Sequence, residues 1–261
     1  MNTSKSYTSQ SRAGSKVVVC FFFLFPAVTL FGCVSFFLSA ILSFSKESAM
    51  GSDNSTWTPE TVLSTLPYRP EENSTSPVPF FHLIERLKTT KREGWRRFGI
   101  DHGESISDHM YRMSIMTMMA PPSLAEKINI PRCIKMALIH DMAEALVGDI
   151  TPVDPVTKPE KARREASVMD YITTTLLGKV PGGALSGQEI KEIFEEYEAN
   201  TTDEAIFVHD IDKMELLLQM VEYERVHKVD LTEFIHVRER IQLEPIQKWA
   251  DEVILGRPNK A

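Results

Sequence analysis

The chain has 261 residues, of which 43% are hydrophobic and 25% charged, a composition typical of a globular protein with one large or two small domains. The net charge of −7 and the pI of about 5.6 exclude a broad basic surface for DNA or RNA, so we expect no nucleic acid partner. A small anionic ligand stays admissible, because one local cation can outweigh the mean charge. Only Cys133 lies outside an N-terminal apolar run, which excludes a disulfide-stapled scaffold.

That apolar run lies between Lys16 and Lys46 and contains no charged residue. Residues 17–45 are long enough to cross a bilayer, and the basic residues before them would keep the N-terminus cytosolic and export the rest. Met50 supports a second interpretation, in which it is a start site and residues 1–49 are an upstream extension absent from the main product. Both interpretations stay open, and we expect membrane association only if residues 17–45 are retained.

Residues 50–79 are rich in Ser, Thr, Pro and Asn, and we predict that they form a disordered linker. From Phe80 to residue 258 the pattern changes to apolar residues at helical spacing, which indicates a folded domain. The predicted helical segments are residues 80–90, 107–120, 131–148, 158–177, 186–199, 202–226 and, as one or two helices, 231–255.

Local signals support the third of these segments, residues 131–148. Pro131 suits the first turn of a helix, and Gly148 suits its end. No credible run of alternating strand residues occurs anywhere in the domain. We therefore predict an all-α fold.

The stretch LIHDMAEALVGDI carries the first chemical signal. On a helix His140, Asp141 and Glu144 would project over roughly one face. Burying an imidazole and two carboxylates without partners would cost several kcal/mol, and a divalent cation would compensate for that cost. The plainer alternative is a hydrogen-bonded His-Asp pair at a helix surface. His109 and the acids of FVHDID could complete a mixed nitrogen and oxygen site, suited to Mn, Co, Fe, Mg or Zn.

Three motifs together resemble the HD-domain metal-dependent phosphohydrolases. They are SISDHMYRM, ALIHDMAEALVGDITP and a later D-x-x-E segment followed by EYE, and they are most similar to the 5′-deoxynucleotidase branch. The resemblance covers roughly Phe80 to Val253. It implies a single all-helical HD domain, a bound divalent metal (Mn, Co, Mg or Zn), hydrolysis of deoxynucleoside 5′-monophosphates to deoxynucleoside and phosphate, and a homodimer.

By position, the resemblance implies that the metal ligands are His109, His140, Asp141 and one aspartate of FVHDID. That last segment contains a second literal His-Asp pair, His209-Asp210. Helical phase by itself leaves Asp210 and Asp212 both open. The family's aspartate precedes an x-x-Glu step, which selects Asp212.

Two further acids follow the first His-Asp pair. Glu144 would lie one turn beyond His140 and could take a proton from metal-bound water. We predict that Asp149 is the second catalytic acid, and the resemblance places its loop, Asp149, Ile150, Thr151 and Pro152, at the border of the substrate. Alternatively Glu144, Asp149 and the carbonyl of Ile150 hold a second, weaker cation, and for each acid alone an ordinary solvated role is the simplest interpretation.

The segment KREGWRRFGI contains Trp95, which by itself would be interpreted as core packing. The resemblance implies that this tryptophan packs near the sugar and helps to reject ribose. Bacterial members carry arginine directly before it, to orient the phosphate, whereas this chain has Gly94. Arg92, Arg96 or Arg97 would then have to supply that role.

The leading hypothesis is therefore a metal-dependent 5′-deoxynucleotidase acting on a small nucleotide. The alternatives are another HD-type nucleotide phosphohydrolase (a phosphodiesterase or triphosphohydrolase) and a non-catalytic, membrane-anchored helical adaptor. Export would separate the site from the nucleotide pool, so we expect a cytoplasmic protein, and a membrane-anchored one if residues 1–49 belong to the mature chain.

Overall fold

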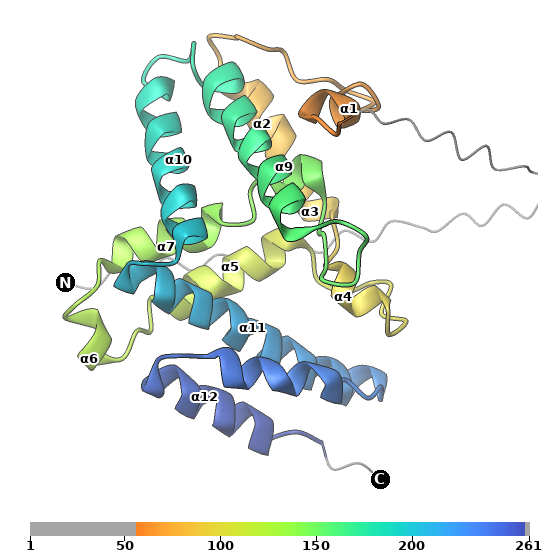
Figure 1. The fold of residues 1–261 in the computed structure, drawn as a ribbon, viewed down its shortest axis with the longest axis vertical. Helices are drawn as coiled ribbons and strands as arrows, with labels where there is room; N and C mark the ends of the chain where they lie inside the picture. The colour runs from red at the N-terminus through yellow and green to blue at the C-terminus, as the bar shows by residue number, and fades with distance from the viewer. Residues whose placement is uncertain (1–55, 259–261) are drawn as a thin grey trace, which may run out of the picture. The chain divides into compact units, whose positions relative to one another are not determined.

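Helices form the framework of residues 56–258, the part of the chain that the computed structural model describes (Figure 1). Within this part there is no β-strand, and Lys91 and Ser105 form an isolated antiparallel bridge. The all-α prediction is confirmed. The apolar segment 17–45 and Met50 lie outside the described residues.

The first half of the described chain contains short helices around two longer ones. They are α1 (Pro59–Leu63), α2 (Val78–Ile84), α3 (Arg86–Thr89), α4 (Glu93–Arg96), α5 (Ile106–Thr117), α6 (Pro122–Ala125), α7 (Ile130–Ile139) and α8 (Glu144–Val147). The second half contains α9 (Lys158–Asp170), which continues as a π-helical turn η1 (Tyr171–Leu176), then α10 (Gly183–Ala199), α11 (Asp203–His227), the 3₁₀ segment η2 (Thr232–Arg240) and α12 (Glu244–Leu255).

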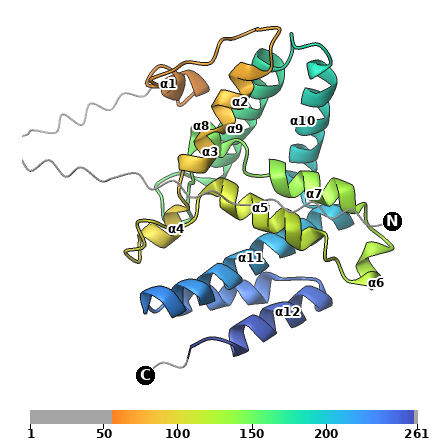
Figure 2. The same ribbon diagram turned by 180° about the vertical axis from the view of Figure 1, so that it is seen from behind.

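The helix α11 runs through the middle of this unit and contacts α5, α7, α10, η2 and α12 (Figures 1 and 2). The helices α5 and α7 also pack against each other. Fully buried side chains fill the centre between them, among them Met113, Cys133 and Phe207. Because three helices meet there, side chains from distant parts of the sequence lie close together.

Local signals set several helix ends. Ser105 begins α5 with a capping box, in which its hydroxyl accepts from the Asp108 amide and the Asp108 carboxylate accepts from the Ser105 amide. Asn129 caps α7, with Pro131 in the first turn as predicted. The predicted stop at Gly148 is confirmed, since Gly148 has a φ of 77°, a conformation that favours glycine.

One predicted helix, residues 131–148, is broken. The helix α7 ends at Ile139, and α8 starts only at Glu144. Between them the backbone bonds to the third preceding residue instead of the fourth, as in Met142 N to Ile139 O at 2.9 Å and Glu144 N to Asp141 O at 3.0 Å. His140 and Asp141, at the start of this tighter turn, both line the same cavity.

The chain also differs from the expected disordered linker, because residues 56–77 are folded. Leu63 of α1 is only 2% exposed, and α1 contacts α8 and α9. Arg163 donates to the Trp57 carbonyl at 2.7 Å, and the guanidinium of Arg164 lies over the Trp57 ring. Apolar residues scattered among Ser, Thr and Pro supply this anchoring. The division of the chain at residues 50 and 80 stays a prediction.

No helix among residues 56–258 combines the length and the apolar character that crossing a bilayer would demand.

Candidate metal centre and active site

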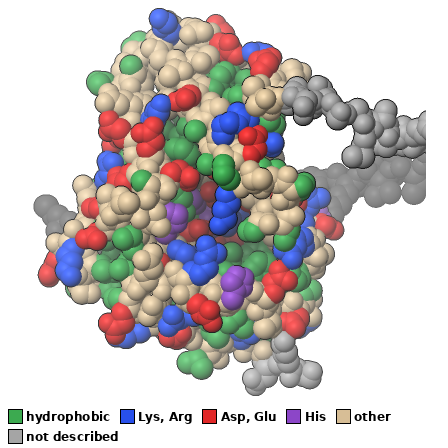
Figure 3. All heavy atoms as spheres, viewed as in Figure 1, with side chains coloured by type: hydrophobic (Ala, Val, Ile, Leu, Met, Phe, Trp, Pro, Cys, Tyr) green, Lys and Arg blue, Asp and Glu red, His purple; other side chains and the backbone are tan. Residues whose placement is uncertain are grey.

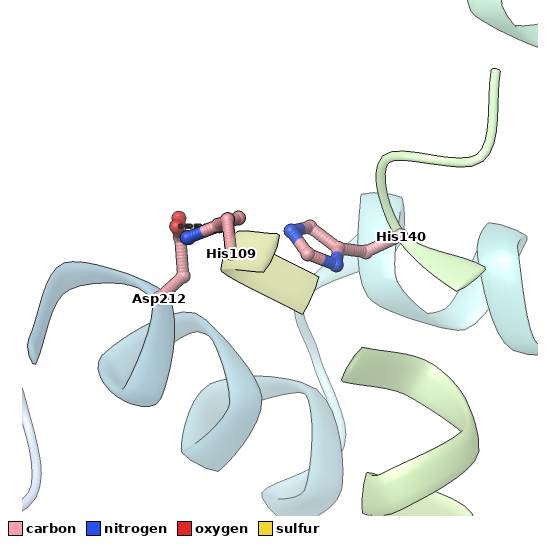
Figure 4. A group of neighbouring side chains, drawn as sticks. All are labelled: His109, His140 and Asp212. Atoms are coloured by element: carbon pink, nitrogen blue, oxygen red, sulfur yellow. Dashed lines mark ion pairs between the residues drawn. The ribbon is translucent and has the colours of Figure 1, made fainter. Parts of the chain in front are cut away.

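Three helices bring a cluster of possible metal ligands together (Figure 4). His109 lies on α5, His140 directly follows α7, and Asp212 lies on α11. One ligand atom from each of the three lies within 4.8 Å of the others. Both imidazoles are buried, and His109 is 0% exposed. Residues more than 100 positions apart therefore form one nitrogen and oxygen donor set.

The orientation of His109 is set from behind by Glu215, three residues after Asp212 on α11. Its Nδ1 lies 2.6 Å from Glu215 Oε2, and Arg112 Nε donates to the other Glu215 oxygen at 2.7 Å. A carboxylate on Nδ1 directs Nε2 toward the cluster, where Asp212 Oδ1 lies 3.2 Å away. Burial and nearby Arg92 lower the pKa of His109, but Glu215 and Asp212 outweigh them and raise it to about 10. Without a cation, these carboxylates therefore favour the doubly protonated, charged form of the ring.

Each of the two histidines has one ring nitrogen, Nε2, that no hydrogen bond satisfies. Nδ1 of His140 lies 3.1 Å from the Ala137 carbonyl, which accepts its hydrogen. Nε2 of His109 and Nε2 of His140 are buried and lie 3.2 Å from Asp212 Oδ1 and 3.1 Å from Asp141 Oδ2, but neither contact has the geometry of a hydrogen bond. A buried polar atom without a partner costs free energy, and one cation between the rings would satisfy both nitrogens. The donor set therefore fits a divalent metal.

Asp141 and Asp212 supply the negative charge of the cluster. Arg92 lies between them, with guanidinium nitrogens 3.1 Å from Asp141 Oδ2 and 3.9 Å from Asp212 Oδ1. Burial raises the pKa of both carboxyl groups, but the neighbouring histidines and Arg92 more than compensate and hold each pKa well below its usual value. Both groups are therefore ionised at neutral pH, as metal ligands must be.

The second His-Asp pair, His209-Asp210, lies on α11, and Asp210 is two residues before Asp212. Asp210 faces away from the cluster and is fully buried. Its Oδ2 accepts from the backbone amides of Gln242 and Leu243, at 2.9 and 2.7 Å, and so holds the chain that leads into α12. Of the two aspartates that helical phase left open, Asp212 is the one beside His109.

The acids Glu144 and Asp149 line a cavity together with Asp141. Glu144 is 2% exposed, its Oε2 has no hydrogen-bond partner, and Lys161 Nζ is 3.9 Å from Oε1. Burial, together with Asp141 and Asp149, raises the pKa of Glu144 well above its usual value. Asp149 accepts from the Glu93 amide at 2.6 Å, and burial raises its pKa. Both acids therefore hold protons more tightly than surface carboxylates do.

One cavity of about 560 Å³ is lined by six of these residues, Arg92, His140, Asp141, Glu144, Asp149 and Asp212, but not by His109. Figure 3 shows the hollow on this face, where basic, acidic and histidine side chains meet. The volume lies in the range of small-molecule sites. The predicted substrate residues Trp95, Asp149, Ile150, Thr151 and Pro152 all line it. The sequence reasoning thus named several residues that share one cavity.

Trp95 packs in the core and also lines the cavity. It is 2% exposed, and its ring contacts those of Tyr223 and Phe234 at centroid distances of 5.3 and 5.0 Å. Its indole nitrogen donates to Glu104 Oε1 at 2.8 Å. Burial raises the pKa of Glu104 to about 7. This bond fixes the tryptophan plane, and the sequence carried no signal for it.

The three candidate arginines have separate surroundings. Arg92 reaches the proposed metal ligands, as described above. Arg96 pairs with Glu93 at 2.7 Å on the surface, and Arg97, at the cavity rim, pairs with Glu233 at 2.8 Å. At Gly94, which also lines the cavity, an added Cβ would meet no atom within 4 Å.

Several cavity residues escaped the sequence reasoning. Lys161 belongs to a charged stretch typical of a solvated helix start, yet it lines the cavity and lies 3.3 Å from Glu165. Tyr197 and Glu198 of α10 also line it. Both residues belong to a Glu-Tyr-Glu sequence at residues 196–198, and the same three residues recur at 222–224. This motif is the sequence signal that could have pointed to them.

The comparisons with known proteins agree with this geometry. Residues 84–250 match the HD domain family. The 5′-deoxynucleotidase hdd1 of Schizosaccharomyces pombe is 48% identical over 187 residues, covering 70% of this chain and 91% of hdd1. The 5′-deoxynucleotidase YGK1 of Saccharomyces cerevisiae is 41% identical over 180 residues, covering 68% of this chain and 81% of YGK1.

Solved structures show the same fold. The structure of YGK1 superimposes with a TM-score of 0.53 at 28% identity, covering 76% of this chain and 95% of that one. A structure titled as a predicted metal-dependent phosphohydrolase from Magnetospirillum magnetotacticum has a TM-score of 0.51 at 25% identity, covering 68% and 88%. By sequence and by fold, the chain belongs to the HD domain family, in the branch that contains the curated 5′-deoxynucleotidases.

Proposed function

We propose that this protein is a divalent-metal-dependent 5′-deoxynucleotidase, which hydrolyses deoxynucleoside 5′-monophosphates to deoxynucleoside and phosphate. One observation carries the proposal: the Nε2 atoms of His109 and His140, which no hydrogen bond satisfies, converge with Asp212 beside a nucleotide-sized cavity. The names of the relatives supply the substrate class.

The metal would be held by His109, His140, Asp141 and Asp212. Such a mixed donor set suits Mn, Co, Mg or Zn. When bound, the cation would supply Lewis acidity toward water and the phosphate oxygens. Glu215 keeps the Nε2 of His109 directed at the cation, and the Ala137 carbonyl does the same for His140.

Glu144 is our general base. Its Oε2 is buried without a hydrogen-bond partner and lies in the same cavity wall as Asp141. In its ionised form, a carboxylate of raised pKa is a stronger base toward the attacking water than an ordinary one. Asp149 borders the substrate. The alternative role for Glu144, Asp149 and the Ile150 carbonyl, as a second and weaker cation site, makes a different prediction in the Glu144 variant below.

Arg92 is our candidate for orienting the phosphate in the absence of an arginine at position 94. Its guanidinium already reaches both aspartates of the cluster, and a phosphate bound beside them would lie within its range. Trp95 forms the sugar side of the cavity, with Thr151 and Pro152 on the loop that lines it.

We also propose a homodimer, on the strength of the family resemblance. Exposed apolar side chains follow one face of α5 and its end: Tyr111, Ile115, Met118 and Met119. Such a row is a candidate contact between two copies. Light scattering should give twice the chain mass, and Ile115→Lys should reduce it to one, whereas Leu185→Lys on α10 should not. A monomeric wild type would refute the dimer.

The cellular location is a separate proposal: a cytosolic enzyme that lacks residues 1–49. Peptides from residues 1–16 in a membrane fraction, with glycans on Asn73 or Asn200, would contradict it.

The test of the activity is a phosphate-release screen. Purified protein would be stripped of metal, reloaded with Mn, Co, Mg or Zn, and offered deoxynucleoside and ribonucleoside monophosphates, cyclic dinucleotides and deoxynucleoside triphosphates. We expect inorganic phosphate from the deoxynucleoside monophosphates above all. Release of triphosphate from triphosphates, or cleavage of diesters in their place, would assign the site to another HD-type hydrolase.

A further inference from the structure

Tyr197 is a cavity residue to which the proposed mechanism gives no role. It lies near the end of α10 and is 7% exposed, and it lines the same cavity as His140, Asp141 and Asp212. Its hydroxyl makes no hydrogen bond to any described residue. The hydroxyl oxygen is nevertheless accessible and not fully buried. A nearly buried phenol therefore presents a free donor to the cavity.

Two histidine rings hold this phenol in place. The Tyr197 ring lies 4.9 Å from the His140 ring and stacks on the His209 ring at 3.9 Å, with an interplanar angle of 16°. His209 Nε2 in turn donates to the Tyr197 backbone carbonyl at 3.0 Å. Lys213 donates to the His209 carbonyl at 2.7 Å. The position of the hydroxyl is thus set before a ligand arrives, which is the condition for an effective hydrogen-bond donor.

The position and chemistry of the hydroxyl point to phosphate as its partner. The ring packs on His140, a proposed metal ligand, whereas Trp95 on the sugar side belongs to a separate cluster with Tyr223 and Phe234. The cavity also contains many carboxylates, so an incoming phosphate dianion needs donors that carry no negative charge.

We propose that Tyr197 donates a hydrogen bond to a phosphate oxygen of the bound monophosphate, and that His209 is a positioning residue for the Tyr197 ring. This inference rests on the proposed function, because it assumes that phosphate binds beside the metal ligands. It also gives a role to the histidine of the second His-Asp pair, which otherwise has none in the site.

The decisive variant is Tyr197→Phe, which removes the hydroxyl and keeps the ring on both histidines. The matched control is Tyr68→Phe, since Tyr68 is 57% exposed and also has an edge contact with a histidine, His82, far from the cluster in sequence. Two quantities would be measured on metal-loaded protein: the affinity for inorganic phosphate by calorimetry, and kcat/KM for dAMP.

We expect Tyr197→Phe to weaken phosphate binding and to lower kcat/KM, each by roughly 10- to 100-fold, the range for one hydrogen bond to a charged group. Metal content and melting temperature should match the wild type, and Tyr68→Phe should change nothing. Unchanged phosphate affinity, or a loss of metal or of thermal stability, would overturn the assignment.

The outcomes separate this inference from the proposed function. A wild type that is inactive on dAMP but binds phosphate more tightly than Tyr197→Phe would refute the activity and support the hydrogen bond. An active wild type with an unaffected variant would do the reverse.

The role of His209 needs a double-mutant cycle. His209→Leu should weaken phosphate binding several-fold in the wild type, because the ring loses its stacking partner. In the Tyr197→Phe background the same change should have no effect, since there is no hydroxyl left to position. Equal losses in both backgrounds would show that His209 does not act through Tyr197.

Discussion

The molecule contains two His-Asp dipeptides with opposite surroundings. His140-Asp141 follows the end of α7, in a tight turn, and both side chains line the cavity. His209-Asp210 lies inside the continuous helix α11, where consecutive side chains diverge by about 100°. His209 there faces Tyr197 and the cavity, while Asp210 faces the chain before α12.

The difference teaches that the surroundings of a dipeptide decide whether it can form a metal site. Asp141 lies beside His140, His109 and Arg92. Asp210 instead accepts hydrogen bonds from the backbone amides of Gln242 and Leu243. The fourth residue after each histidine differs as well: Glu144 follows His140, and Lys213 follows His209.

The largest expected effect distinguishes His140 from His209. His140→Ala should abolish both metal retention and turnover, because it removes a ligand and leaves Asp141 and Asp212 repelling each other. The loss of metal affinity should exceed about 100-fold, the upper range for residues that only support a ligand. His209→Ala should retain its metal. Elemental analysis of both dialysed variants is the measurement, and full occupancy in His140→Ala would contradict the comparison.

Glu144→Gln tests the acid that accompanies the first pair. The amide keeps the shape but cannot accept the proton, so kcat should fall by roughly 10²- to 10⁴-fold with the metal still bound. The kinetics would be measured at saturating metal. A wild-type rate would rule out the base, and recovery of the rate on adding more metal would favour the second-cation role.

Asp212→Asn and Asp210→Asn should lose different properties, metal affinity in the first and stability in the second. The first should lose metal affinity and keep its stability. The second should keep its metal and lose about 1–3 kcal/mol of unfolding free energy, because the buried carboxylate binds two backbone amides. Metal titration and urea denaturation of both variants would show this. Metal loss in Asp210→Asn with Asp212→Asn unaffected would exchange the two assignments.

The smallest effect concerns pH and His209. Burial lowers the pKa of His209 below its usual value of 6.5. Below pH 6.5 the unfolded chain therefore takes up a proton there before the folded chain does, and this contribution to stability is lost as the pH falls through that window. His209→Asn should show a flatter decline of the unfolding free energy between pH 7 and pH 5 than the wild type. Identical slopes in urea denaturation would indicate that burial does not perturb this ring.

Sequence reasoning located most of the proposed site because its signals are local. Ser105, Asn129, Pro131 and Gly148 set helix ends through bonds and backbone angles that involve only their neighbours. The family motifs then placed His109 and His140 at the points where α5 and α7 approach α11. Trp95 lines the cavity together with the other predicted substrate residues, although its hydrogen bond to Glu104 was not foreseen.

The amino-acid sequence by itself determined the all-helical fold, the family and the donor types, because periodicity, caps and motifs are properties of neighbouring residues. The tertiary structure decided which donors share a cavity. It turned the chain at His140, directed Asp212 rather than Asp210 to His109, folded residues 56–77 onto the domain, and brought Tyr197 and Lys161 to the cavity. Each of these depends on contacts between helices far apart in the chain, and such contacts have no counterpart in local sequence patterns.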